Sequence, residues 1–388
     1  MATFADGKIE AYVGPRELGA HDDLEAVICG FIGGARSTLD LAVQEIDSEP
    51  IAQAVLDARW RGVDVRAFVE QDYLRSKRPK GALAVSPRGG ETEDEARHRM
   101  QWGEEVGDLG LNRRILASFL RSDIEIKGDY NPEIFHQKFV LRDYRGKALP
   151  TSALLTGSAN FTTTDTHKNL NHVFVFNDHR ICREYRREVD QLEHGDFGRG
   201  AHGDAPATYG LAGVPVKVLF APDHTPELEL IKQMLRCEER VDFAIFTFSG
   251  SSGIDDAMAM LVAADRRVRG VLDAGQGRQW WSATKWLHDK QIEVFLPSPD
   301  SNVRKLHHKL MVIDDCTVVA GSMNYTRPAN EFNDENIFVI GSPYDREERV
   351  EVDHAECARL ANHMRDEVER IARDLSEPFT PAAKQRSA

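Results

Sequence analysis

The chain has 388 residues, which is enough for two domains with substantial hydrophobic cores. A formal net charge of −14 disfavours unspecific binding to nucleic acid or anionic lipid, although a cleft can still carry a local positive potential. No apolar run is long enough to span a bilayer, and the first residues lack the features of a secretory signal. The five cysteines are scattered and lack metal-ligand spacing, which indicates reduced thiols. These features together predict a cytoplasmic protein.

Segments of the same kind recur in the same order in both halves of the chain. The segments that have the pattern of buried strands and amphipathic helices are strand 39–46, helix 51–60 and strand 63–70, then strand 241–248, helix 254–264 and strand 268–273. A strand, a helix and a strand in close order predict βαβ units and a largely parallel sheet.

A glycine-rich segment over residues 195–214 predicts a linker between an N-terminal half, 1–194, and a C-terminal half, 215–388. The second half ends in a charged stretch, about 345–375, that predicts a helix. The first half carries an insertion at about 71–112, which begins with a basic cluster and continues through an acidic stretch. This insertion is either a solvated surface excursion or a lid that guides substrate.

One motif occurs twice in the chain. Each copy is a His-x-Lys, an aspartate five residues after the lysine, and a downstream Gly-Ser-x-Asn turn. The members are His136, Lys138, Asp143, Ser158 and Asn160 in the first copy, and His307, Lys309, Asp314, Ser322 and Asn324 in the second. Because residues two apart on a strand share a face, each histidine points the same way as its lysine. His308 should point away, so the adjacent histidines are not expected to chelate one metal.

This set of residue types suits the hydrolysis of a phosphodiester. Such a reaction needs a nucleophile for phosphorus, a proton for the leaving oxygen and compensation of charge on the non-bridging oxygens. Two opposed histidines can supply the first two, and the lysines and asparagines can supply the third without a metal or cofactor. The serine of each turn adds a hydroxyl near the phosphate. A lone His-x-Lys is usually an ordinary strand, whereas two complete copies indicate one active site built from two halves.

The motifs resemble the signature of the phospholipase D superfamily, His-x-Lys-x(4)-Asp with a following Gly-Ser-x-Asn, over nearly all of residues 10–340. The resemblance implies an α/β fold in which two tandem α/β/α sandwich halves pack about a pseudo-twofold axis and share an active site at their interface. It implies that one of His136 and His307 forms a covalent phosphohistidine while the other is general acid and then base, without metal. It also implies that Asp143 and Asp314 are structural.

One position departs from the symmetry of the repeat. Eleven residues after the motif asparagine, the second half has Glu335 and the first half has Asn171. In the superfamily this position orients an active-site histidine. A glutamate also stabilises an imidazolium, so the histidine that Glu335 serves should be the better proton donor. If each partner serves its own half, His307 is the acid and His136 the nucleophile, whereas cross-pairing reverses these roles.

Cations and aromatic residues stand near the second motif. Arg304 and Lys305 precede it directly, and Trp280 and Trp281 lie upstream. Cations interleaved with aromatic rings suit a nucleic-acid backbone and stacked bases. The two Gly-Ser-x-Asn turns also resemble those of compact nuclease-type members of the superfamily. We therefore expect a nuclease that cleaves DNA or RNA, through contacts that are local and sensitive to salt.

Three alternatives have less support from the sequence. A phospholipase D that hydrolyses or transfers the phosphatidyl group of phospholipids is disfavoured by the densely charged insertion and the missing secretory signal. A non-catalytic nucleic-acid-binding scaffold predicts damage to a motif, and both copies are intact. A metallohydrolase needs a cluster of ligands at metal spacing, which the sequence lacks. Because one chain contains both half-sites, a monomer suffices for activity, and the sequence leaves the oligomeric state open.

Overall fold

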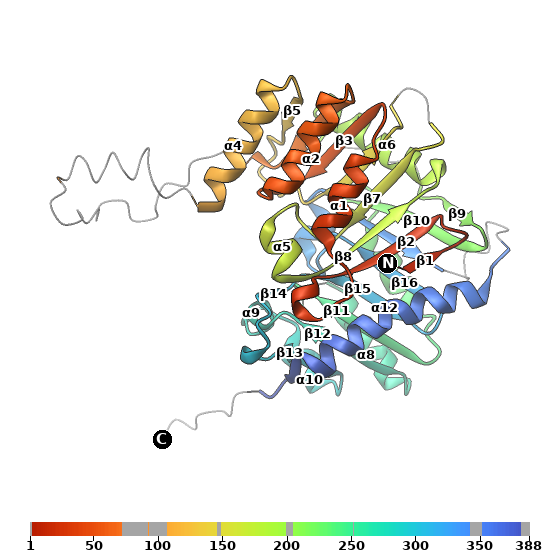
Figure 1. Ribbon diagram of the computed structural model, residues 1–388. Helices are drawn as coiled ribbons and strands as arrows, with labels where there is room; N and C mark the ends of the chain where they lie inside the picture. Colours follow the sequence, from red (N-terminus) through yellow and green to blue (C-terminus); the bar gives the residue numbers. More distant parts are fainter. Residues whose placement is uncertain are drawn as a thin grey trace.

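The computed structural model describes residues 2–71, 92, 107–145, 149–198, 205–250, 252–341 and 351–381. The basic and acidic clusters of the predicted insertion lie outside these residues. Within them the chain forms two mixed sheets, each flanked by helices (Figure 1). This is the α/β architecture of two similar halves that the repeat and the resemblance predict.

The first sheet belongs mainly to the N-terminal half. Its strands, in spatial order, are β1 (Ala2–Phe4), β2 (Ile9–Gly14), β8 (Asn169–Phe176), β7 (Ala153–Gly157), β6 (Lys138–Arg142), β3 (Thr38–Val43), β4 (Asp64–Val69) and β5 (Glu125–Gly128). A ninth strand, β14 (Lys305–Leu306), comes from the C-terminal half and pairs in parallel with β8. The second half therefore adds a strand to the sheet of the first.

The second sheet belongs to the C-terminal half. Its strands, in spatial order, are β18 (Ser376–Pro378), β13 (Glu293–Pro297), β12 (Arg267–Leu272), β11 (Arg240–Ile245), β15 (Lys309–Ile313), β16 (Thr317–Gly321), β17 (Glu335–Ile340), β10 (Val214–Ala221) and β9 (Thr208–Leu211). The predicted strands 39–46, 63–70, 241–248 and 268–273 correspond to β3, β4, β11 and β12.

The helices cover both sheets. Those of the first half are α1 (Leu24–Gly33), α2 (Glu49–Trp60), α4 (Gly107–Arg121), α5 (Thr163–His167) and α6 (His179–His194), with a 3-10 turn η1 (Arg16–Leu18). Those of the second half are α7 (Pro226–Met234), α8 (Ile254–Ala263), α9 (Ala274–Gly277), α10 (Thr284–Asp289), α11 (Arg327–Glu331) and α12 (His354–Asp374), with η3 (Pro299–Ser301). The predicted helices 51–60 and 254–264 correspond to α2 and α8.

The strand pairing differs from the largely parallel sheet that the strand-helix-strand order predicts. Among the described strands, parallel pairs are confined to β3–β4–β5, β11–β12–β13 and β14–β8, and the other neighbours are antiparallel. The reason is that β6, β7 and β8, like β15, β16 and β17, reverse direction at each connection. Such reversals lack the long crossover that a parallel pair requires.

The two halves share one hydrophobic core. Side chains from both sheets and from α6 and α12 form a single buried cluster, in which Phe174 of β8 meets Phe338 of β17 with ring centroids 5.0 Å apart. Separate clusters lie under α1 and α2 in the first half and under α7 and α8 in the second. Burial on both sides of each sheet explains the nearly continuous apolar runs of the central strands.

The chain passes from the first half to the second after α6, which ends at His194 with Gly195 as its left-handed cap. The second sheet begins at β9, inside the segment predicted as a linker. The long α12 corresponds to the predicted C-terminal helix and packs along the second sheet (Figure 1). No helix in the described part of the chain is long and apolar enough to cross a membrane. All five cysteines are free thiols, and Cys182, Cys237 and Cys357 are buried.

Candidate active site

His136 lies at the start of β6, against a segment of the opposite half. The backbone N–H of His136 donates to the carbonyl oxygen of Asp334 at 3.0 Å, and the backbone N–H of Phe135 donates to the Glu70 carboxylate at 2.8 Å. Phe135 also forms an isolated parallel bridge with Asp334. The second half therefore holds the backbone that carries this histidine.

His307 lies in the matching place between β14 and β15. Its backbone N–H donates to the carbonyl oxygen of Leu170 at 2.9 Å, and the N–H of Leu306 donates to the Asp273 carboxylate at 3.0 Å. The pairing of β14 with β8 extends this contact. The backbone around each histidine is thus held by contacts within its own half and by contacts to the other half.

The side chains pair across the interface as well. Nδ1 of His136 lies 2.6 Å from Oε2 of Glu335, and Nδ1 of His307 lies 3.1 Å from Oδ1 of Asn171. Each orienting residue therefore serves the histidine of the other half. The assignment of His307 as acid and His136 as nucleophile, which rests on pairing within one half, does not hold for this geometry. For cross-pairing, the sequence predicts the opposite assignment, with His136 as the acid and His307 as the nucleophile.

The two motif lysines lie beside the histidines and are fully buried. Nζ of Lys138 donates to the carbonyl oxygen of His136 at 2.7 Å, and Nζ of Lys309 donates to that of His307 at 2.8 Å. Burial lowers the pKa of Lys138 to about 8, and burial together with the charge of Lys138 lowers the pKa of Lys309 well below its usual value. Two desolvated ammonium groups that repel each other favour an anion between them.

The serines of the Gly-Ser-x-Asn turns do not have the role that the sequence predicts for them, which is a hydroxyl near the phosphate. The hydroxyl of Ser158 donates to Oδ1 of Asn171 at 2.7 Å, and that of Ser322 donates to Oε2 of Glu335 at 2.6 Å. Both serines are fully buried, so they hold the orienting residues rather than offering a hydroxyl to the phosphate. The carbonyl oxygens of the Asn160 and Asn324 side chains are buried and accept no hydrogen bond.

The carboxylates of Asp143 and Asp314 bind backbone N–H groups, contacts that fit the structural role that the resemblance implies. The Asp143 carboxylate accepts the backbone N–H groups of residues 36–38, at the entry to β3. The Asp314 carboxylate accepts those of residues 238–240, at the entry to β11. Each aspartate joins the end of the motif strand to the start of its neighbour. His308 points away from the site, as predicted, and its Nδ1 lies 3.1 Å from Nδ1 of His172.

Sequence reasoning missed Asp165. Its carboxylate is buried, with Oδ2 3.3 Å from Nδ1 of His307 and 2.6 Å from the backbone N–H of Asn160. The signal was present in the repeat, since Asp165 follows Asn160 by five residues and the matching position in the second half is Ala329. A comparison of the two halves that is limited to the motif residues does not include this position.

Sequence reasoning also missed Gln44 and Phe246, two matching residues that directly follow strands β3 and β11. Gln44 accepts a hydrogen bond from Lys138 at 3.1 Å. The matching residue, Phe246, places its ring 5.1 Å from Nζ of Lys309 and packs edge-on against His307, with centroids 4.8 Å apart. The aligned segments 39–46 and 241–248 contain both residues, but their pattern indicated only buried strands.

The four predicted substrate-binding residues do not lie together. Lys305 is exposed, and its Nζ stands 5.5 Å from the centroid of the Phe246 ring that contacts His307. Arg304 is exposed and donates to Oγ1 of Thr164 in α5 at 3.1 Å. Trp280 is 93% exposed and Trp281 is half-buried, and among the described contacts neither connects to a histidine. The cations therefore border the site, and the tryptophans are not placed in it.

Burial also governs the ionisation of the histidines. It lowers the pKa of His136 well below its usual value, with the two motif lysines adding to this, and it raises the pKa of Glu335 to about 8. With 2.6 Å between Nδ1 and Oε2, this pair shares one proton and titrates as a unit. Burial lowers the pKa of His307 to about 4, against the opposing charge of Asp165.

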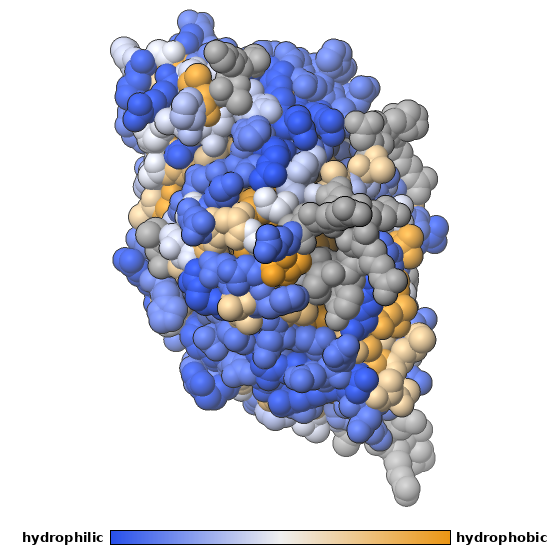
Figure 2. Space-filling view, turned by 90° about the vertical axis from the view of Figure 1, so that its right-hand side faces the viewer, coloured by the Kyte–Doolittle hydropathy of each residue, from blue (hydrophilic) through white to orange (hydrophobic). Residues whose placement is uncertain are grey.

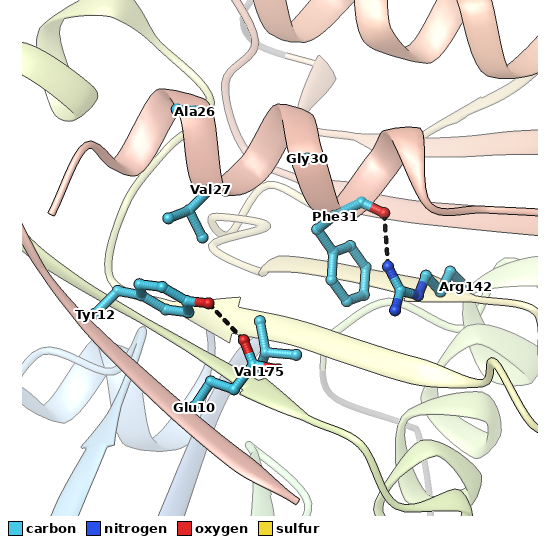
Figure 3. A pocket seen from close by; sticks show the side chains of 8 residues that line it. All are labelled: Glu10, Tyr12, Ala26, Val27, Gly30, Phe31, Arg142 and Val175. Carbon is cyan, nitrogen blue, oxygen red and sulfur yellow. Dashed lines mark hydrogen bonds between the residues drawn. The ribbon is translucent and has the colours of Figure 1, made fainter. Parts of the chain in front are cut away.

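A surface cavity elsewhere in the first half is separate from this site. It has a volume of about 290 Å³ and lies between α1 and the strands β2, β6 and β8 (Figure 3). The residues that line it are Glu10, Tyr12, Ala26, Val27, Gly30, Phe31, Arg142 and Val175. No motif residue belongs to this lining. Among the described residues, no group of three or more His, Cys, Asp or Glu side chains is arranged to hold a metal ion.

The arrangement can perform a two-step displacement at an anion. Both Nδ1 atoms are held by oxygen atoms, which leaves Nε2 of each imidazole for chemistry. A positive charge on His307 would lower the pKa of His136. Two buried ammonium groups accompany them. This set can attack an anion, protonate a leaving oxygen and compensate negative charge.

Comparison with known proteins shows similarity in both halves of the chain. The model of the family described as "Cardiolipin synthase, PLD-like domain" matches residues 28–193 and 230–364. The chain is 28% identical over 185 residues to the mitochondrial cardiolipin hydrolase of Chlamydomonas reinhardtii, covering 41% of this chain and 81% of that protein. It is 31% identical over 128 residues to the mitochondrial cardiolipin hydrolase of Xenopus laevis, covering 32% of this chain and 59% of the frog protein.

Solved structures show the same fold at low sequence identity. The phosphatidylserine synthase of Haemophilus influenzae Rd KW20 superposes with a TM-score of 0.62 and 11% identity, covering 98% of this chain and 88% of that protein. The likeness extends over both halves, so the two-half arrangement is common to the two proteins.

Proposed function

The chain belongs to the phospholipase D superfamily of phosphodiesterases, and we propose that it is a nuclease that cleaves DNA or RNA through a covalent phosphohistidine. The observation that carries the chemistry is the crossed arrangement of the site. Two buried imidazoles have their Nδ1 atoms held by the opposite half, beside two buried lysines. An anionic phosphodiester would bring compensating charge to the place where the lysines repel each other.

The cross-pairing supports His307 as the nucleophile and His136 as the acid. In the first step, the Nε2 lone pair of His307 attacks phosphorus, the bond to the leaving oxygen breaks, and that oxygen takes the proton from Nε2 of His136. In the second step, water attacks phosphorus, its proton passes to His136, and the bond between phosphorus and His307 breaks. Lys138 and Lys309 stabilise the charge on the non-bridging oxygens throughout.

A nucleic-acid substrate is supported by the surroundings of the site. Arg304 and Lys305 are exposed cations directly before the second motif, and Lys305 stands over the ring that contacts His307. Cations in that position can bind phosphates adjacent to the scissile one. The face of the molecule in Figure 2 carries mostly hydrophilic side chains, with hydrophobic ones in separate patches.

Phospholipid is the second candidate, and the comparisons favour it specifically. The two relatives described above are named cardiolipin hydrolases, and the description of the matching family model names cardiolipin synthase. A phospholipid offers the same phosphodiester to the two imidazoles. The difference between the candidates therefore lies in the groups that bind the rest of the substrate.

A substrate panel in excess chelator tests the proposal. It contains single-stranded and double-stranded DNA, RNA, bis(4-nitrophenyl) phosphate, and vesicles of phosphatidylcholine with and without cardiolipin. Wild type should cleave a nucleic acid and the aryl diester, and His136→Ala should not cleave the nucleic acid. Hydrolysis of lipid without strand cleavage would replace the nuclease with a phospholipase. The double variant Arg304→Ala/Lys305→Ala should raise KM for the oligonucleotide and leave the aryl diester unaffected.

A trapping experiment tests the assignment of the histidines. 4-Nitrophenolate leaves without an acid, so His136→Ala should still attack bis(4-nitrophenyl) phosphate and then accumulate phosphorylated His307, because the base for hydrolysis is missing. His307→Ala should trap nothing. Peptide mapping after alkaline quenching reads out the label. A label on His136 in the His307→Ala variant, with none in His136→Ala, would assign the roles the other way round.

A further inference from the structure

The two halves serve their histidines with different groups at the same position. Glu335 approaches His136 with a carboxylate oxygen, 2.6 Å from Nδ1. The matching contact, from Asn171 to Nδ1 of His307, is made by a neutral amide oxygen at 3.1 Å. If Asn171 were its only partner, His307 would lack the negative group that His136 has.

Asp165 lies where such a partner is needed. It is the third residue of α5, and Ala329 is the third residue of α11. The helices begin alike, because the Thr162 side chain caps the backbone N–H of Asp165 and the Thr326 side chain caps that of Ala329. The same local frame thus presents a carboxylate in one half and a methyl group in the other.

The carboxylate of Asp165 is fixed and points at His307. It is 3% exposed, and its Oδ2 lies 3.3 Å from Nδ1 of the imidazole. The backbone N–H of Asn160 donates to Oδ2 at 2.6 Å, and the Asn169 side chain donates to Oδ1. Burial opposes ionisation, but the charge of His307 and these hydrogen bonds hold the pKa of Asp165 far below its usual value. A buried, ionised carboxylate therefore faces the imidazole.

We propose that Asp165 is a positioning residue that supplies the carboxylate partner of His307, in place of the glutamate that the second half supplies from position 335. This inference rests on the proposed function, because the positive charge that matters for turnover develops on His307 when its Nε2 bonds to phosphorus. A carboxylate 3.3 Å from Nδ1 stabilises that charge. In the first half the acid is Asp165 and the neutral residue is Asn171. In the second half the neutral residue is Ala329, which matches Asp165, and the acid is Glu335, which matches Asn171.

The test gives the first half the same placement of carboxylate and neutral residue that the second half has. Asp165→Asn removes the charge and keeps the shape, Asp165→Ala removes the group, and Asp165→Ala/Asn171→Glu moves the carboxylate to the position used by Glu335. Two quantities are measured: turnover of bis(4-nitrophenyl) phosphate, and the titration of the His307 imidazole by ¹⁵N NMR in the free protein.

In the Asp165→Asn variant, kcat should fall about 10–100-fold with KM changed by no more than about twofold. The His307 titration should move to lower pH, because the carboxylate favours the imidazolium. The Asp165→Ala/Asn171→Glu variant should recover most of kcat and move the titration back up. Such recovery distinguishes partnership with His307 from a role in folding alone.

Two results would overturn the proposal. One is an Asp165→Asn variant with the turnover and the His307 titration of wild type. The other is a double variant that folds like wild type yet turns over as slowly as Asp165→Ala, with no recovery of the titration. The titration needs no substrate, so it reports on Asp165 even if the substrate panel rejects the proposed nuclease.

Discussion

At the scale of single residues, burial assigns the protonation states of the site. His307 loses most of its affinity for protons, with a pKa lowered to about 4, and is therefore neutral and able to attack at ordinary pH. Burial raises the pKa of Glu335 to about 8, so the pair that Glu335 forms with His136 keeps a shared proton under the same conditions. These protonation states are the ones that the proposed two-step displacement requires, with a neutral His307 and a proton held by the His136–Glu335 pair.

These ionisations predict the pH dependence of kcat/KM on a substrate with a poor leaving group, such as an oligonucleotide. The rate should fall below a pKa of about 4 as His307 gains a proton, and above a pKa of about 8 as the His136–Glu335 pair loses one. Lys138, whose pKa burial lowers to about 8, loses its charge in the same alkaline range. Initial rates measured over that pH range at constant ionic strength give the acidic and the alkaline limb of the pH–rate profile.

The variant Glu335→Gln distinguishes the two groups that could cause the fall in rate at alkaline pH, which are the His136–Glu335 pair and Lys138. A neutral amide cannot share the proton, so burial lowers the pKa of His136 without opposition and the alkaline limb should move to lower pH. On a substrate with a poor leaving group, kcat at neutral pH should drop about 100-fold or more, as expected for loss of a general acid. An alkaline limb that stays in place in this variant would assign that limb to Lys138.

At the scale of elements, the motif strands depend on contacts at their ends. Asp143 follows β6 and gathers the backbone N–H groups that precede β3, and Asp314 does the same for β15 and β11. Both aspartates adopt positive φ, which is typical of a tight turn at a strand end. The aspartate of each motif therefore fixes the strand that carries the lysine, while the chemistry occurs at the other end of that strand.

The variant Asp143→Asn tests this division. Hydrogen bonds to a charged acceptor are lost, so the free energy of unfolding should fall by about 1–3 kcal/mol, while kcat per folded molecule should stay the same. Urea unfolding, together with turnover at a temperature where the protein is folded, measures both. Asp366→Asn, an exposed aspartate in the middle of α12, is the matched control and should leave both quantities unchanged. A loss of kcat without a loss of stability would place Asp143 in the chemistry instead.

At the scale of the whole molecule, two buried polar networks of matching position join the halves behind the site. In one, the Asn336 side chain donates to Gln137 at 2.6 Å, and Gln137 donates to Glu188 at 3.1 Å. In the other, the matching residues are His172 and His308, stacked with centroids 5.4 Å apart, and His308 faces Glu367. One network is built from amides and the other from imidazoles.

The imidazole network should make stability depend on pH. Burial lowers the pKa of both His172 and His308, with Glu367 opposing the shift at His308. The nearby charges of His307, Lys309 and Arg370 act in the direction of burial. As pH falls through about 6.5, the unfolded chain therefore takes up protons that the folded chain does not, and stability is lost.

Replacing the pair by the amides of the other network, as His172→Asn/His308→Gln, should remove this contribution. Between pH 7 and pH 5, wild type should lose about 2–4 kcal/mol more of its free energy of unfolding than the double variant does. Urea unfolding of both proteins at the two pH values gives the difference. Equal losses would mean that the pair takes up protons in the folded protein as readily as in the unfolded chain.

Much of the active site could be read from the repeat. His136, Lys138, Asn160 and their counterparts were identified because the spacing of a strand and a turn is local, and local spacing is written in the order of residues. The strands and helices around them followed for the same reason. The strand directions did not, since hydrophobic runs show that a strand is buried but not which neighbour it pairs with.

What the tertiary structure decided is which half serves which histidine. Nothing in the order of residues distinguishes pairing within a half from pairing across the interface, because the choice depends on how two similar surfaces pack. That packing places Glu335 on His136 and Asn171 with Asp165 on His307. Cross-pairing is the case for which the sequence predicts His136 as the acid and His307 as the nucleophile. The sequence by itself thus determined the chemical groups, and the contact between the halves determined their partners.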